Sequence, residues 1–222
     1  AGDAWGLLGP LRQHKALSAP DYAQLETRLA AQSLEQAGDA NALAERWELV
    51  PKALRTERAV VAAYATRAAA LRWDDAATHA LEHALDSRWD EDLIALYGRL
   101  PVGKLDSRRA SAQRWLQAHS DSPALLLTLA RLARQQGQWP QAQEFLHRAL
   151  AQGGGAEAWE ELGHGYAAAG EDLLARRSYA NALAAQRGEL PATAPDRDLR
   201  QQIHDQAVTE TRDEHGLPRL PE

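Results

Sequence analysis

The chain has 222 residues, 45% of them hydrophobic, and a formal net charge of −6. This negative charge argues against a basic surface that would bind nucleic acid. The lack of cysteine excludes disulfides and thiolate metal sites. The sequence contains no run of 18 apolar residues that would form a membrane-spanning helix. Alanine, leucine, arginine, glutamate and glutamine are abundant and phenylalanine occurs once, a composition that favours helices with small contact residues.

The first residues predict part of a helical hairpin. Gly2-Asp3 has the composition of a turn between helices, and Trp5, Leu8 and Leu11 follow it at helical spacing. We therefore expect the second helix of a hairpin whose first helix lies upstream, in a chain that begins inside a larger protein.

Helix signals continue along the next part of the chain. Ser18, followed closely by a proline, marks the start of one helix. Gly38 turns the chain, and a second helix ends at Pro51. Another pair of helices occupies residues 58–90. In that pair Arg72 stands at the turn, where this kind of hairpin has glycine, so the copy is imperfect.

A small residue recurs at separations of 33, 32 and 33 residues, at Ala77, Ala110, Ala142 and Ala175. A fixed period of this length is typical of stacked helical hairpins. The pattern predicts hairpins at residues 58–90, 91–122, 123–155 and 156–187. The hairpin at 91–122 is degenerate, because Pro101 and Gly103 disfavour a continuous helix.

The last two hairpins share the residues of the tetratricopeptide (TPR) repeat. Glycine occupies the turn of each, at Gly137 and Gly170. The final hairpin also has the characteristic large and small residues of the repeat: Trp159, Leu162, Gly163 and Tyr166. This resemblance implies an all-α fold, a right-handed α-solenoid of about five TPR-like hairpins over residues 1–187, in which small residues let paired helices approach closely. Residues 188–222 are expected to form a linker followed by a capping helix or a loose tail.

A broader resemblance covers residues 3–187. Its most specific parts are the segment from Trp47 to Pro51, the segment Tyr97-Gly-Arg-Leu-Pro101 and the turn Gln138-Trp139. In these parts the chain resembles the C-terminal TPR region of the HemY-type proteins, proteobacterial inner-membrane proteins associated with haem biosynthesis and distinct from protoporphyrinogen oxidase. The resemblance implies two membrane-spanning helices upstream, a domain on the cytoplasmic face of the bacterial inner membrane, and a link to protohaem synthesis. It supplies no catalytic motif.

The inner groove of a TPR stack is lined mainly by the first helix of each hairpin. That rule predicts a partner-binding groove made by five residues of the last two hairpins: Arg131, Arg134, Gln135, Glu160 and His164. The arginines favour an acidic or carboxylate-bearing ligand, and Glu160 gives the groove mixed charge. His164 lies two residues before Tyr166, at a position from which it could also ligate haem iron.

Other chemistry in the sequence is sparse. His79 and His83 are four residues apart, a spacing that can hold a metal from one helix face, but no third ligand is evident and no metal site is expected. P-loop, Rossmann, GxSxG and HExxH motifs are absent. The Glu-Ser dipeptide that begins the catalytic domain of lytic transglycosylases is absent as well. We therefore expect neither an enzyme nor a resident cofactor.

Two classes of function fit these observations. The first is an interaction scaffold that binds a protein or peptide in its concave groove, with a haem-pathway enzyme as the partner or, alternatively, as a general peptide adaptor unrelated to haem. The second is a haem or porphyrin carrier. A repeat array presents a long shallow groove more readily than the deep apolar pocket that a macrocycle needs, so the sequence favours the scaffold.

Overall fold

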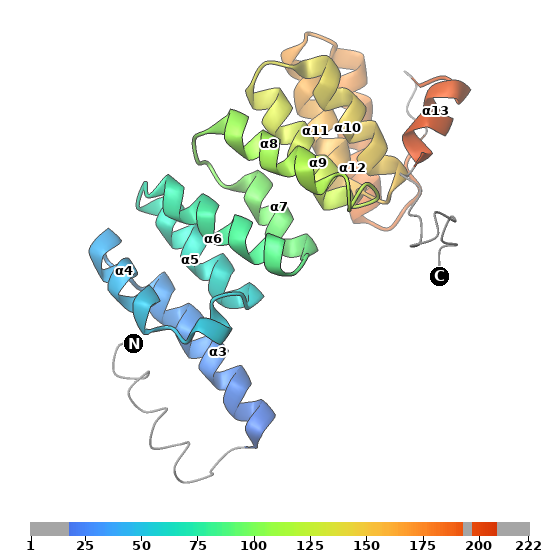
Figure 1. Ribbon diagram of the computed structural model, residues 1–222. Coiled ribbons are helices and arrows are strands. Elements are labelled where there is room, and N and C mark those ends of the chain that lie inside the picture. The colour runs from blue at the N-terminus through green and yellow to red at the C-terminus, as the bar shows by residue number, and fades with distance from the viewer. Residues whose placement is uncertain (1–17, 193–196, 208–222) are drawn as a thin grey trace, which may run out of the picture. The chain divides into compact units, whose positions relative to one another are not determined.

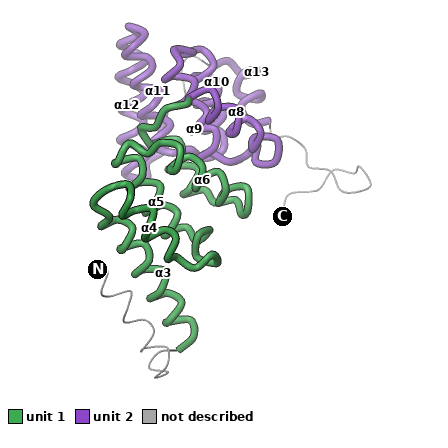
Figure 2. The backbone as a smooth tube through the Cα atoms, turned by 60° about the vertical axis from the view of Figure 1, so that its left-hand side comes forward, with its two compact units in different colours: residues 1–104 green, residues 105–222 purple. Residues whose placement is uncertain are grey.

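The computed structural model describes residues 18–192 and 197–207, and all regular structure in these ranges is helical (Figure 1). The chain divides into two compact units, residues 1–104 and residues 105–222 (Figure 2). The fold class is therefore all-α, and within each unit neighbouring helices pack against one another as in an α-solenoid.

Two expectations extend beyond these ranges. No described helix is long and apolar enough to cross a membrane, and the implied membrane helices upstream stay a prediction. The truncated hairpin expected at Trp5, Leu8 and Leu11 lies outside the described residues, as does most of the tail, residues 208–222.

Unit 1 contains five described α-helices and one 3-10 helix. They are α3 (Ala19–Glu35), α4 (Ala40–Leu49), η1 (Lys52–Leu54), α5 (Arg58–Ala70), α6 (Asp74–Ser87) and α7 (Glu91–Arg99). Helix α5 lies at the centre, because it packs against α3, α4, α6 and α7. Short polar side chains begin three of these helices by accepting hydrogen bonds from backbone N–H groups. They are Ser18 for α3, Asp39 for α4 and Asp90 for α7.

The turn between α5 and α6 keeps the conformation of a glycine turn although it holds an arginine. Arg72 has a φ of 62°, in the left-handed region, like Gly137 (73°) and Gly170 (79°) at the turns of the later hairpins. In each of the three turns the following residue donates its N–H to a carbonyl five residues back. The backbone of this turn is thus regular, and Arg72 carries the strain that glycine avoids.

Unit 2 contains six described α-helices. They are α8 (Leu105–Trp115), α9 (Pro123–Gln135), α10 (Trp139–Ala151), α11 (Gly155–Ala168), α12 (Asp172–Gln186) and α13 (Leu199–Gln206). Helices α9 and α10 pack as one pair and α11 and α12 as another, and the contact between α10 and α11 joins the two pairs. Helix α8 packs against α9.

Two glycines of α11 allow close contact with neighbouring helices. A Cβ added at Gly163 would lie 2.5 Å from the ring of Tyr179 in α12, and one added at Gly165 would lie 1.9 Å from the ring of Trp139 in α10. Both distances are far below the ordinary carbon–carbon contact of about 3.5–4.0 Å. The small residue that the repeat pattern predicts at Gly163 is therefore required by packing. Gly165 has the same role, although the sequence pattern does not single it out.

The prediction of recurring buried alanines is right in three helices and wrong in one. The buried ones are Ala77, Ala142 and Ala175. Ala110 is exposed, and the buried alanine of α8 is Ala112. The loop before α8 contains Pro101 and Lys104, the latter at a φ of 56°, and this irregular backbone breaks the register that a constant period assumes. The degenerate repeat at 91–122 is also divided between the units, with α7 in unit 1 and α8 in unit 2.

A helix is present in the expected capping segment, and its main contact is with α10. Arg197, which is buried, joins the two elements by donating hydrogen bonds to Glu144 of α10 and to Asp205 of α13. Asp198 and Gln201 form a capping box at the start of α13. The polar helix is thus attached to the second helix of a hairpin by ion pairs.

Candidate functional site

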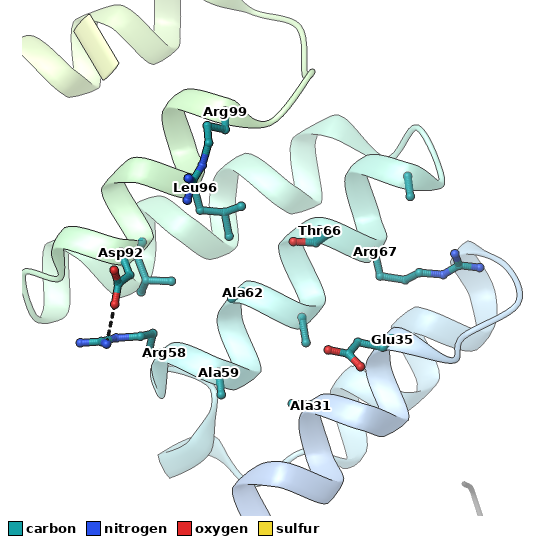
Figure 3. Close-up of a pocket in the computed structure, with 13 residues that line it drawn as sticks. Ala31, Glu35, Arg58, Ala59, Ala62, Thr66, Arg67, Asp92, Leu96 and Arg99 are labelled. Atoms are coloured by element: carbon teal, nitrogen blue, oxygen red, sulfur yellow. Dashed lines mark hydrogen bonds and ion pairs between the residues drawn. The ribbon is translucent and has the colours of Figure 1, made fainter. Parts of the chain in front are cut away.

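A groove of about 820 Å³ crosses one face of unit 1 (Figure 3). Its walls come from α3, α5 and α7, which are the first helices of successive hairpins. The TPR pattern assigns partner binding to this set of helices, but the groove lies earlier in the chain than the residues selected from the sequence.

Small apolar residues form the floor of this groove, hereafter the alanine groove. They are Ala31, Ala59, Ala62, Ala63 and Ala70, joined by Leu93 and Leu96 of α7. Because an alanine side chain ends at Cβ, the helices leave open space between them. Ala59 and Ala70 are exposed, whereas Val60 and Ala65 on other sides of α5 are fully buried. Helix α5 is therefore apolar on two sides, and only one of them is covered by the core.

Charged side chains stand along the rim of the alanine groove. Arg58 of α5 donates from Nε to Asp90 at 2.7 Å and from Nη1 to Asp92 at 2.5 Å, which ties α5 to α7 (Figure 3). The hydrogen bond to Asp90, with the charges of both aspartates, raises the pKa of Arg58 above its ordinary value. Arg67 donates from Nε to the carbonyl oxygen of Ala37 at 2.6 Å and so links α5 to the end of α3.

The charges of the alanine groove and its rim are mixed. The lining holds Arg58, Arg67 and Arg99 with Glu35 and Asp92, and Asp90 pairs with Arg58 at the same edge. Since Arg67 donates to backbone carbonyls, its charge is not cancelled by a carboxylate among the described residues. The electrostatics of the groove favour a partner that carries carboxylates.

The arginines predicted as groove residues lie in unit 2 and are engaged with glutamates of the next repeat. Arg131 donates to Glu161 at 2.8 Å and to Glu157 at 3.0 Å, and Arg134 donates to Glu161 at 2.9 Å. The side chains of Arg131 and Glu161 are only 11% and 12% exposed. The sequence analysis selected Glu160 as a groove residue beside these arginines. The carboxylates that pair with them in the structure are Glu157 and Glu161, which share a helix face, and Glu160 points about 100° away from Glu161.

The other three predicted residues are exposed. Gln135, Glu160 and His164 all lie on the surface of unit 2. The ring of His164 contacts the edge of Tyr179 in α12, with 5.6 Å between ring centroids. The structure thus joins Arg131 and Arg134 in one ion-pair network and directs His164 toward α12.

The described residues hold no group of three or more histidine, cysteine, aspartate or glutamate side chains arranged to hold a metal ion. The alanine groove itself is lined by no side chain that commonly ligates haem iron. The groove offers apolar contact along its floor and charge pairing at its rim.

Comparison with known proteins supports the repeat assignment. A family profile described as "Tetratricopeptide repeat" matches residues 109–163. The match runs from α8 through α9 and α10 to Gly163 in α11. Searches of curated proteins and of solved structures gave no match. The chain therefore contains a TPR-like segment, and it is similar to proteins whose repeats generally serve in protein–protein interaction.

Proposed function

We propose that the protein is a non-catalytic interaction scaffold that binds a segment of a partner protein in the alanine groove of unit 1. The observation that carries this proposal is an open, apolar floor on α5 in a unit whose remaining apolar residues are mostly buried. A volume of about 820 Å³ lies within the range of ligand sites, about 300–1,000 Å³. Helical repeat proteins use such surfaces to bind other chains.

The lining indicates which kind of segment fits. Alanines leave room for the large aliphatic or aromatic side chains of a partner, which would bury apolar area in the groove. Arg67 at the rim favours acidic residues flanking those side chains. The partner segment is therefore amphipathic, with bulky apolar anchors and acidic flanks.

The resemblance to HemY-type proteins supports a finer form of this proposal. In that form the partner is a haem-pathway enzyme, and the domain lies on the cytoplasmic face of the inner membrane. The five residues selected from the sequence define a second surface, of which Gln135, Glu160 and His164 are open to a partner. The first choice is the alanine groove, because Arg131 and Arg134 already have carboxylate partners in unit 2.

Site-specific photo-cross-linking tests the groove. A photoreactive residue is placed at Ala62 in the groove and, as the matched control, at Ala180, an exposed alanine on α12. In native cells we expect a discrete partner to be captured at position 62 and not at position 180. Arg99→Glu should reduce that capture, because it reverses a rim charge.

Two results would count against the proposal in different ways. Equal capture at both positions would remove the groove as the binding site. Capture of a partner outside haem synthesis would support the scaffold but reject the finer form of the proposal.

A visible absorption titration with haemin tests the alternative that the protein is a haem carrier. A shifted Soret band at one haem per chain, lost in His164→Ala, would favour the carrier over the scaffold.

A further inference from the structure

A second cavity of unit 1, of about 480 Å³, lies among α4, α5 and α6. It differs from the alanine groove in both position and chemistry, since none of its lining residues lines that groove. Its lining is aromatic and polar and comprises Trp47, Arg55, Tyr64, Trp73, Asp75, Ala76, His79, Ala80 and His83.

The aromatic residues of this cavity are mutually packed. Trp47 stacks on Tyr64 with 4.0 Å between ring centroids, and Trp73 meets the edge of Tyr64 at 6.4 Å. The guanidinium carbon of Arg55 lies 5.7 Å from the centre of the Trp47 ring. Burial raises the pKa of Tyr64, so its hydroxyl stays neutral. These contacts make a rigid wall opposite α6.

His79 and His83, unlike the packed aromatic residues of the wall, are exposed. Neither histidine makes a hydrogen bond or ion pair with any described residue. His79 and His83 are one helical turn apart on α6, a spacing that brings Cβ atoms to within about 5–6 Å on one face. Helix α6 is held in place from its other side by buried Leu81 and Leu85. The backbone therefore presents both imidazoles together before any ligand arrives.

We propose that His79 and His83 form a two-imidazole binding site for a divalent transition-metal ion of the Cu²⁺, Ni²⁺ or Zn²⁺ class. Neutral imidazole suits these ions, and a histidine pair one turn apart is a recurring metal-binding arrangement on helices. The carboxylate of Asp75, one turn before His79, lines the same cavity and adds negative charge, although Lys104 pairs with it at 2.6 Å. The protein supplies two donors, consistent with the lack of any three-residue cluster among the described residues. Water completes the coordination.

Metal binding by a histidine pair should respond to substitution differently from metal binding by unrelated surface histidines. The eight histidines of the chain include only one pair four residues apart. A chelate needs both members of that pair, so removing either imidazole should weaken binding of the one metal per chain, and removing both should weaken it further. Two independent histidines would instead lose half of the bound metal with each substitution.

The test uses the full chain without an affinity tag, titrated with Cu²⁺ and Ni²⁺ salts. Trp47 and Trp73 line the cavity, so a bound paramagnetic ion should quench tryptophan fluorescence at one metal per chain. His79→Ala and His83→Ala should each weaken binding by about tenfold or more, and the double variant should bind more weakly still. His164→Ala is the matched control, because His164 is exposed and has no histidine one turn away.

The proposal is overturned if each single variant keeps half the stoichiometry, or if His164→Ala weakens binding as strongly as His79→Ala. Unchanged far-UV circular dichroism in the absence of metal separates loss of the site from loss of the fold. Should an alanine variant unfold, His79→Gln and His83→Gln keep a polar side chain of similar reach, and the same weakening of metal binding is expected of them. Quenching that persists in the double variant would place the metal elsewhere and reject the site.

Discussion

Replacing Gly165 by alanine should destabilise unit 2, although alanine is the better helix former. The added Cβ would lie 1.9 Å and 2.1 Å from two atoms of the Trp139 ring. Against an ordinary contact of about 3.5–4.0 Å, this is an overlap of about 1.5–2 Å. Helix α11 cannot absorb such an overlap by bending, so either Trp139 leaves its place or α10 and α11 separate.

The magnitude follows from what Trp139 would lose. Its ring meets the edge of Tyr166 with 5.3 Å between centroids, a contact worth about 0.5–1.5 kcal/mol beyond area burial. Overpacking of a closely fitted contact costs about 1–3 kcal/mol. The helix preference for alanine over glycine returns about 1 kcal/mol. The free energy of unfolding should therefore fall by about 2 kcal/mol, measured by urea unfolding followed by far-UV circular dichroism.

A double-mutant cycle tests the reason as well as the size of the effect. In a Trp139→Ala background the space beside Gly165 is open, so Gly165→Ala should stabilise the protein by up to about 1 kcal/mol. The sign of the change must reverse between the two backgrounds. An increase in stability from Gly165→Ala while Trp139 is present, or an equal change in both backgrounds, would refute the packing argument.

Three further predictions concern Arg72, Glu161 and Glu144. Arg72→Gly should stabilise unit 1 by about 0.5–1 kcal/mol in urea unfolding, because it relieves a left-handed φ of 62°. Glu161→Gln should lower stability by about 2 kcal/mol, since it removes the carboxylate shared by two arginines, one of them only 11% exposed, whereas Glu160→Gln should have little effect. The pKa of Glu144 is lowered, mainly by hydrogen bonds from Arg197, so its stabilising contribution is complete above the ordinary value of 4.5 and lost as the pH falls below it. The protection factors for hydrogen exchange in α13, which correct for the intrinsic pH dependence of exchange, should fall on acidification, and Glu144→Gln should show the lower protection already at neutral pH.

The repeat architecture could be predicted because its signals are local. Turn glycines at Gly137 and Gly170 adopt the positive φ that their spacing implies, and Gly163 faces the ring that requires a small residue. Each of these signals concerns one hairpin and its own two helices. The fixed period then extends the assignment along the chain.

The register of α8 could not be predicted from that period. A constant spacing assumes equal loops, and the loop with Pro101 and Lys104 is irregular, so Ala112 takes the buried position in place of Ala110. The ion pairs of Arg131 could not be predicted from the sequence either. Adjacent glutamates on a helix differ by about 100° in direction, so a small error in helix orientation decides whether Glu160 or Glu161 faces the arginine.

The sequence contains a pattern that indicates the alanine groove, but the pattern can be interpreted only with the structure. The segment of residues 58–70 has apolar residues on every side, which is typical of a helix with two contact faces. Sequence alone cannot tell whether the second face is covered by another helix or left open. The structure answers this, because α3, α4, α6 and α7 surround α5 and still leave Ala59 and Ala70 exposed.

The same set of helices therefore has different roles in the two units. On α9 and α11 the facing positions hold arginines and glutamates. Their side chains occupy the space between the two helices, and their ion pairs stabilise the contact between neighbouring repeats. On α5 the corresponding face holds alanines, which provide neither bulk nor charge to close the space. At the rim of unit 1, Arg58 and Arg67 tie α5 to α7 and α3, in addition to the buried core. A floor left open by small residues and a frame held rigid at its edges are the properties that a preorganised binding groove requires.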